Sequence, residues 1–276
     1  MKLALCNEVV AGGRDFAAQC RLAAALGYQG LEIAPFTLDD VPHKLSAQRI
    51  REIRAIAEDA SLKISGLHWL LVKPAGLSIT AAEATVRERT LDVLYHLIDL
   101  CAALGGEMMV HGSPAQRRLP DHEADIARAN ATKILAAVAE RAARAGVTYC
   151  IEPLAVPGAN FINTLEEAAG LLREVGSPAL RTMIDCSASV QMEREPLDAL
   201  AARWLPTGLV AHIQVNDRNR RGPGQGADPF APLIATLKRL NYRGWIAVEP
   251  FDYVPDGAAC AARSIGYLQG LIEGTP

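Results

Sequence analysis

Short apolar runs alternate with longer segments of helical periodicity along the whole chain. The short runs are continuously apolar, which is typical of strands buried on both faces of a parallel sheet. They predict strands at residues 2–6, 29–33, 62–67, 107–110, 147–151, 180–184, 209–215 and 244–248.

Each predicted strand is followed by a predicted helix. The helices are expected over residues 15–26, 46–59, 81–104, 123–144, 165–175, 196–204, 229–240 and 258–272. Glycine follows several of them, at Gly27, Gly105 and Gly146, as is usual at a helix C-terminus.

Repeated strand–helix units predict a parallel sheet, and this number of units favours a single closed (β/α)8 TIM barrel over residues 1–276. An open, doubly wound sheet is the structural alternative. No linker, low-complexity tract or shift in composition indicates a second domain. In a barrel, the functional residues lie at the C-terminal ends of the strands.

Two predicted strands end in the same way, with an apolar run, a glutamate and a proline. They are Ile151-Glu152-Pro153 and Val248-Glu249-Pro250. Proline cannot donate to a strand ladder, so it marks the strand end and places each glutamate at the mouth of the sheet. Two such carboxylates facing one pocket suit acid–base chemistry on a ligand, or a metal site.

Polar residues end four consecutive strands, at Glu152, Asp185, Gln214 and Glu249. Their separation is about one strand–helix repeat, so a barrel brings them to one side of its mouth. Mn²⁺ and Mg²⁺ favour such an all-oxygen set, which is poor for a thiolate-type zinc site. Without a cation, the clustered carboxylates would raise one another's pKa. Ordinary barrel-mouth residues with local partners are the alternative interpretation.

Residues 151–154, 212–217 and 248–251, together with Arg220, resemble the sugar phosphate isomerase/epimerase family of xylose-isomerase-like TIM barrels. This group contains D-tagatose 3-epimerase and hydroxypyruvate isomerase. The resemblance implies a divalent metal, Mn²⁺ first with Mg²⁺ or Co²⁺ as alternatives. It implies the metal ligands Glu152, Asp185, Gln214 and Glu249. It also implies that Arg220 contacts a substrate oxygen.

The chain departs from the epimerases of this group at two positions. They carry histidine where this chain has Ala188 and glutamate where it has Gly158. Both residues normally touch the substrate, so the resemblance implies the same metal centre with a different substrate pocket.

The expected activity is that of a metal-dependent isomerase or epimerase of a keto sugar or related hydroxy-carbonyl compound. Glu152 and Glu249 would be the catalytic residues, transferring a proton through a metal-stabilised cis-enediolate.

The alternative is a lyase or decarboxylase on a sugar-acid-like substrate with the same metal centre. A DNA-repair endonuclease on a similar barrel would need a histidine-rich zinc cluster and a basic face. Six scattered histidines and a net charge of −3 argue against this class of enzyme. A binding protein without activity is the remaining alternative.

Three further residues are candidate substrate contacts. His68 and His111 follow or end predicted strands, and Glu32 interrupts an apolar strand so that it points into the barrel. The alternatives are packed histidines and an internal salt bridge for Glu32. We interpret Arg117 and Arg118, in the loop after the fourth strand, as a solvated pair of charges, with contact to a phosphate or carboxylate as the alternative.

Composition narrows the partners and the location. A net charge of −3 and a pI near 6.1 argue against a nucleic-acid partner. No apolar run reaches the roughly 18 residues of a membrane span. Six cysteines without a CxxC pair, and an N-terminal apolar stretch too short for a signal peptide, favour the cytoplasm. The resemblance implies a homo-oligomer, either a dimer or a tetramer, acting on a small carbohydrate.

Overall fold

In the computed structural model, which describes residues 1–275, eight parallel strands close into a barrel. Each strand pairs with the next one in sequence, and β8 pairs with β1. The predicted (β/α)8 TIM barrel is therefore confirmed, and the open-sheet alternative is wrong. The strands are β1 (Lys2–Cys6), β2 (Gly30–Ile33), β3 (Lys63–Leu67), β4 (Met108–His111), β5 (Thr148–Ile151), β6 (Leu180–Asp185), β7 (Val210–Val215) and β8 (Trp245–Val248).

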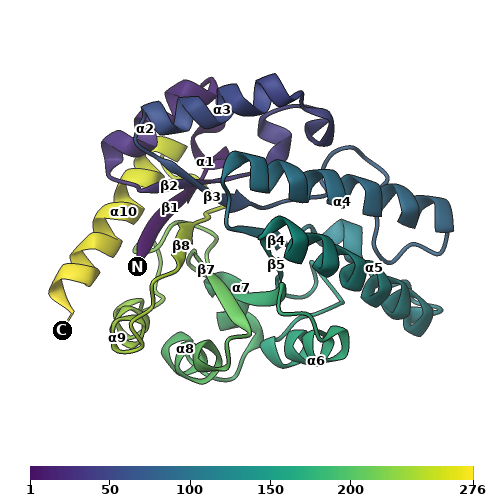
Figure 1. Ribbon diagram of the computed structural model, residues 1–276. Helices are drawn as coiled ribbons and strands as arrows, with labels where there is room; N and C mark the ends of the chain where they lie inside the picture. Colours follow the sequence, from purple (N-terminus) through teal and green to yellow (C-terminus); the bar gives the residue numbers. More distant parts are fainter. Residues whose placement is uncertain (276) are drawn as a thin grey trace.

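Helices form a ring around the barrel, and the start of β1 and the end of α10 lie on the same side of it (Figure 1). The long helices are α2 (Phe16–Leu26), α3 (Ala47–Asp59), α4 (Ala84–Leu104), α5 (Ala124–Ala145), α6 (Leu165–Val175), α8 (Leu197–Trp204), α9 (Ala231–Arg239) and α10 (Gly257–Gly274). Each matches a predicted helix, with ends displaced by at most a few residues.

Two short helices were not predicted. Helix α1 (Glu8–Ala11) directly follows β1, and α7 (Cys186–Met192) directly follows β6. Both lie at the C-terminal ends of strands, where barrels carry their sites. They are too short to show a periodic pattern in the sequence.

Capping residues explain where several helices begin and end. Asp15, Ser46 and Thr164 each accept a hydrogen bond from a backbone N–H in the first turn of a helix. Gly27 and Gly146 end helices in the left-handed region, at φ of 96° and 70°. Regular elements extend from Lys2 to Gly274, and a single domain over residues 1–276 stays a prediction.

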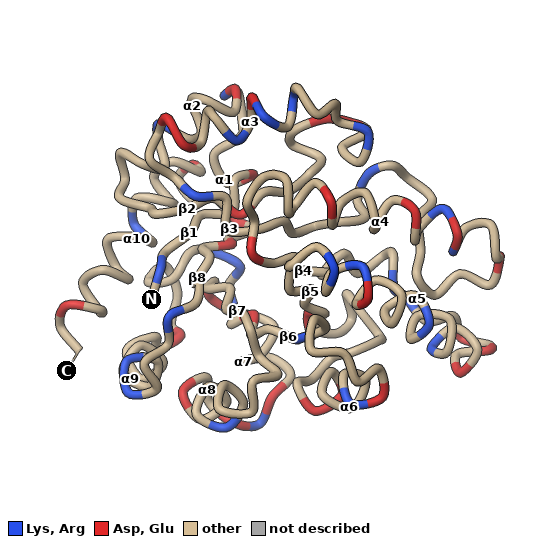
Figure 2. The backbone as a smooth tube through the Cα atoms, in the orientation of Figure 1, with Lys and Arg blue, Asp and Glu red and all other residues tan. Residues whose placement is uncertain are grey.

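Most charged residues lie on the outer helices, with both signs interspersed (Figure 2). The strands are buried on both faces, with Leu5, Leu31 and Ile151 fully inaccessible. Within residues 1–275, no helix combines the length and the apolarity that a membrane span requires.

Strands β3 and β4 approach closely at Gly66, where a Cβ atom would lie 2.0 Å from the carbonyl oxygen of Met108. We expect Gly66→Ala to lower the free energy of unfolding by about 1–3 kcal/mol, because the backbone must shift. Gly170→Ala is the matched control: its Cβ meets nothing within 4 Å on helix α6, so it should stabilise by up to about 1 kcal/mol. Urea denaturation measures both, and equal effects would contradict the close approach.

Candidate active site

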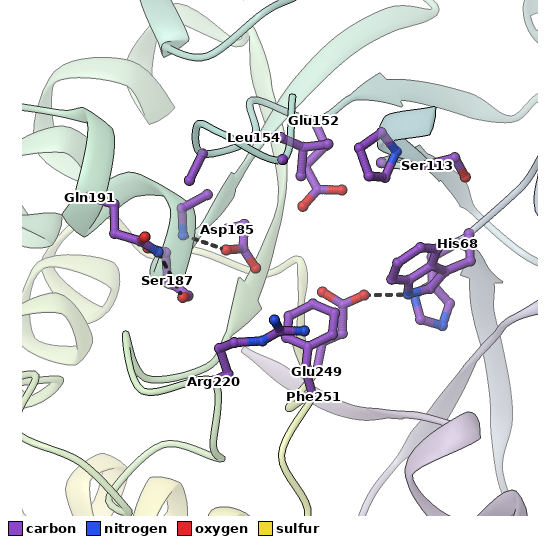
Figure 3. Close-up of a pocket in the computed structure, with 16 residues that line it drawn as sticks. His68, Ser113, Glu152, Leu154, Asp185, Ser187, Gln191, Arg220, Glu249 and Phe251 are labelled. Carbon is purple, nitrogen blue, oxygen red and sulfur yellow. Dashed lines mark hydrogen bonds and ion pairs between the residues drawn. The ribbon is translucent and has the colours of Figure 1, made fainter. Parts of the chain in front are cut away.

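A cavity of about 320 Å³ opens at the C-terminal ends of the strands. Its volume is in the range of small-molecule sites. Three carboxylates, from Glu152, Asp185 and Glu249, point toward its centre (Figure 3). The other lining residues are His68, Trp69, Gly112, Ser113, Pro114, Leu154, Ala155, Gly158, Ser187, Ala188, Gln191, Arg220 and Phe251.

The three carboxylates form one compact cluster, with an oxygen of each within 4.8 Å of the others. Burial raises the pKa of Glu249 to about 8 and the pKa of Asp185 to about 6. Burial, together with repulsion from Glu249 and Asp185, raises the pKa of Glu152 well above its usual range. The cluster therefore retains protons near neutral pH unless a cation compensates its charge.

Helix α7 and strand β7 hold Asp185 in place. Asp185 caps α7 by accepting a hydrogen bond from the Ala188 N–H at 2.7 Å. Its other oxygen accepts from Nδ2 of Asn216 at 2.8 Å. Asn216 also donates to the carbonyl of Glu249 at 3.0 Å, so one buried amide joins the ends of β6, β7 and β8.

His68 holds Glu249. Its Nδ1 lies 3.0 Å from Oε1 of Glu249, and its Nε2 lies 2.9 Å from Oε2 of Glu8 on α1. Burial alone would lower the pKa of His68, but Cys6, Glu8 and the hydrogen bond to Glu249 together raise it well above its usual range. Oε2 of Glu249 is buried without a partner among residues 1–275.

Glu152 is packed tightly against β4. A Cβ at Gly112, the residue after β4, would lie 2.2 Å from Oε2 of Glu152, so a larger residue there would displace this carboxylate. Arg117 is fully buried nearby, and it counteracts the rise in the pKa of Glu152. Burial lowers the pKa of Arg117 itself to about 10. The interpretation of Arg117 as a solvated charge is therefore wrong, whereas Arg118 is exposed.

Gln214 and Glu32 lie inside the barrel and do not line the cavity. Nε2 of Gln214 donates to Oε1 of Glu32 at 2.7 Å, and Nε2 of His212 lies 2.8 Å from Oε2 of Glu32. Burial would raise the pKa of Glu32, but His212 lowers it overall. Contact of Glu32 with substrate stays a prediction, and the structure provides the internal ion pair that was its alternative.

His111 is also fully buried and does not line the cavity. Its Nδ1 lies 2.7 Å from the hydroxyl of Tyr149. Burial and the charge of Arg117 lower its pKa to about 3, so the ring is neutral. Its contact with substrate stays a prediction.

The residues of the cluster fit a divalent cation. Three buried carboxylates offer oxygens within 4.8 Å of one another, and Oε2 of Glu249 and Oε1 of Gln214 are buried oxygens without a partner among residues 1–275. Gln214 pairs in register with Asp185 across β7 and β6, so its amide belongs to the same end of the barrel. Hard cations prefer such oxygen ligands.

Arg220 closes one side of the cavity. It has a positive φ of 69°, and its guanidinium lies over the Phe251 ring at 5.2 Å. Its carbonyl accepts from the N–H groups of Phe251 and Asp252, which ties the loop after β7 to the loop after β8. Trp69 contacts the same ring edge-on, at 6.3 Å between centroids. Ala188 and Gly158 line the wall and add no functional group to it.

A family model described as the xylose isomerase-like TIM barrel matches residues 20–271. The chain belongs to this family. The resemblance seen in the sequence is thereby confirmed, and it covers most of this xylose isomerase-like barrel.

The relatives of this xylose isomerase-like barrel include epimerases and isomerases. D-psicose 3-epimerase of Enterocloster bolteae is 28% identical over 232 residues, covering 83% of this chain and 74% of the relative. 2-Oxo-tetronate isomerase of Cupriavidus necator is 31% identical over 152 residues, covering 53% and 55%. The crystal structure of 3-keto-D-glucoside 4-epimerase from E. coli superposes with a TM-score of 0.83 at 21% identity, covering 98% and 99%. The chain is an enzyme of the isomerase and epimerase class.

Three residues of this xylose isomerase-like barrel were missed as parts of the site. Asn216 follows Gln214 by two positions, so the alternation of the strand was a signal for its inward direction. Glu8 and Arg117 had no such signal, because they come from a four-residue α-helix and a short 3-10 helix (Pro114–Arg117) whose positions depend on packing.

Metal binding to this barrel should depend on pH. Carboxyl groups with a raised pKa keep protons in the folded protein that the unfolded chain releases. The metal-free protein should therefore lose stability as pH rises from 4.5, the ordinary value of Glu249, toward about 8. A cation needs the ionised groups, so we expect Mn²⁺ to bind more weakly at about pH 6 than at about pH 8. Calorimetry at both values measures the affinity. An affinity that does not change with pH would contradict the raised pKa values.

Proposed function

We propose that this xylose isomerase-like barrel is a divalent-metal-dependent epimerase or isomerase of a keto sugar or a related hydroxy-carbonyl compound. The carrying observation is the cluster of Glu152, Asp185 and Glu249, buried and converging in a cavity of small-molecule size. The names of the relatives support a sugar as the substrate class. We propose Mn²⁺ as the metal, with Mg²⁺ and Co²⁺ as alternatives.

Glu152, Asp185 and Glu249 would hold the cation, joined by the amide oxygen of Gln214, which has no partner among residues 1–275. When bound, the cation supplies Lewis acidity, which makes a proton beside the substrate carbonyl easier to remove. Arg220, which lines the same cavity, would contact a substrate oxygen. It has no carboxylate partner within 4.0 Å among residues 1–275, so its guanidinium is available for this role.

Glu152 and Glu249 would move the protons. They directly follow β5 and β8, so they approach a ligand in the cavity from different sides (Figure 3). One carboxylate removes the proton beside the carbonyl. The other returns a proton to the opposite face in an epimerisation, or to the neighbouring carbon in an isomerisation. His68 at Oε1 of Glu249 keeps that carboxylate in one orientation while its other oxygen stays free.

Assembly and location were also predicted from the sequence. The homo-oligomer, a dimer or a tetramer, stays a prediction, and so do the cytoplasmic location and the lack of a nucleic-acid partner.

The first test is stabilisation by metal. Wild type, Glu152→Gln and Glu140→Gln are melted with chelator and then with Mn²⁺, Mg²⁺ or Co²⁺. A cation at 100 times its Kd stabilises the folded form by about 2.7 kcal/mol. We expect this gain in wild type and in Glu140→Gln, whose substituted residue is exposed on α5, but not in Glu152→Gln. Equal gains in all three proteins would refute the proposed metal site.

The second test is turnover of a panel of ketoses and sugar acids in deuterated water. We expect product labelled with deuterium beside the carbonyl. Glu249→Gln should lower kcat by about 100-fold or more, because one proton-transfer group is lost. Full turnover by this variant with metal bound would show that the assignment of Glu249 is wrong. Deuterium exchange without an isomerised product would favour lyase or decarboxylase chemistry.

A further inference from the structure

A chain of contacts leads from Glu249 away from the cavity. The ring of His68 lies between two carboxylates, with Nδ1 at 3.0 Å from Glu249 and Nε2 at 2.9 Å from Glu8. The side chains of His68 and Glu249 are 1% and 4% exposed, and that of Glu8 is 15% exposed. Glu8 does not line the cavity, so it reaches the site only through the imidazole.

These residues, with Cys6, also form a group that could be taken for a second cation site. The geometry of His68 argues against it. Its two ring nitrogens point in different directions, and each already faces one of the carboxylates. A cation shared by Glu8 and Glu249 could use only one of these nitrogens. The arrangement is therefore that of a hydrogen-bonded chain.

The backbone that carries Glu8 is firmly seated. The preceding residue, Asn7, is fully buried and donates to Gln19 and Thr37, while its oxygen accepts from the Ala34 N–H at 2.8 Å. On the other side of α1, a Cβ at Gly257 would lie 1.8 Å from the carbonyl of Val9. Close packing against α10 and the buried amide thus fix the position from which Glu8 reaches His68.

We propose that Glu8 is a positioning residue for Glu249, acting through His68. This inference rests on the proposed function, because it assigns Glu249 to the metal and to proton transfer. Glu8 accepts the Nε2–H and thereby fixes the plane of the ring. Nδ1 of His68 then stays hydrogen-bonded to Oε1 of Glu249, so Oε2 is the oxygen of Glu249 that remains available among residues 1–275. A histidine between a carboxylate and a metal ligand orients that ligand.

The test compares Glu8→Ala, Glu8→Gln, His68→Gln and the double variant Glu8→Ala/His68→Gln. We expect Glu8→Ala to weaken Mn²⁺ binding and to lower kcat at saturating Mn²⁺, each by about 10–100-fold, with KM changed less than about twofold. Glu8→Gln keeps an oxygen that can accept the Nε2–H of His68. Its Mn²⁺ affinity and its kcat should therefore lie close to those of wild type. Glu8→Ala should add nothing in the His68→Gln background, because its effect passes through that ring.

Asp15→Ala is the matched control. Asp15 is an exposed carboxylate of the same strand–helix unit that caps α2, so its loss should lower the melting temperature and leave Mn²⁺ affinity and kcat unchanged. Effects of Glu8→Ala and His68→Gln that multiply in the double variant would overturn the proposal. So would a Glu8→Ala variant with wild-type affinity and kcat.

The ring of His68 gives a readout that needs neither metal nor substrate. In the metal-free protein, the ¹⁵N signal of its Nε2 should shift in Glu8→Ala and return toward wild type in Glu8→Gln. An unmoved signal would overturn the proposal. A wild-type protein that binds Mn²⁺ but turns over none of the tested sugars would instead refute the proposed function and leave the affinity and ring measurements to decide the role of Glu8.

Discussion

The burial of three carboxyl groups side by side, away from water, is the constraint on which the rest of the site depends. Glu152, Asp185 and Glu249 are held together because Asp185 ends a strand of a closed sheet and each glutamate directly follows one. Burial raises the pKa of all three groups, and repulsion from neighbouring carboxylates adds to the rise at Glu152 and Glu249. Much of the surrounding polar structure offsets it: Asn216 and a helix N-terminus at Asp185, and His68 at Glu249.

Closure of the barrel therefore also determines where the carboxylates of the site lie. Strand pairing continues from β1 around to β8, so no strand end can relax outward without breaking the hydrogen bonds of its neighbours. Rigid strands hold the carboxylates, whereas the two short helices α1 and α7 supply the groups that orient them. Preorganisation of this kind is what precise proton transfer requires.

Strand-end residues could be predicted from the sequence, because a parallel sheet places all its C-terminal ends at one edge. The proline after Glu152 and Glu249 marked those ends without any knowledge of packing. The partners of these residues could not be found in this way. Arg117 lies in a polar segment of the sequence that is typical of an exposed loop. Only the tertiary fold shows that this residue is buried beside Glu152. The position of Glu8 likewise depends on tertiary contacts, because the preceding residue, Asn7, is held by its hydrogen bond with the Ala34 N–H.

Glu32 has a consequence for how a glutamine can serve at the end of β7. An ionised carboxylate only accepts hydrogen bonds, so it must face the NH₂ of Gln214 and cannot face its oxygen. An amide has two chemically different ends, and Glu32 selects between them, turning the oxygen the other way. Glu32 thereby fixes which end of the Gln214 amide faces which way, although Glu32 itself does not line the cavity.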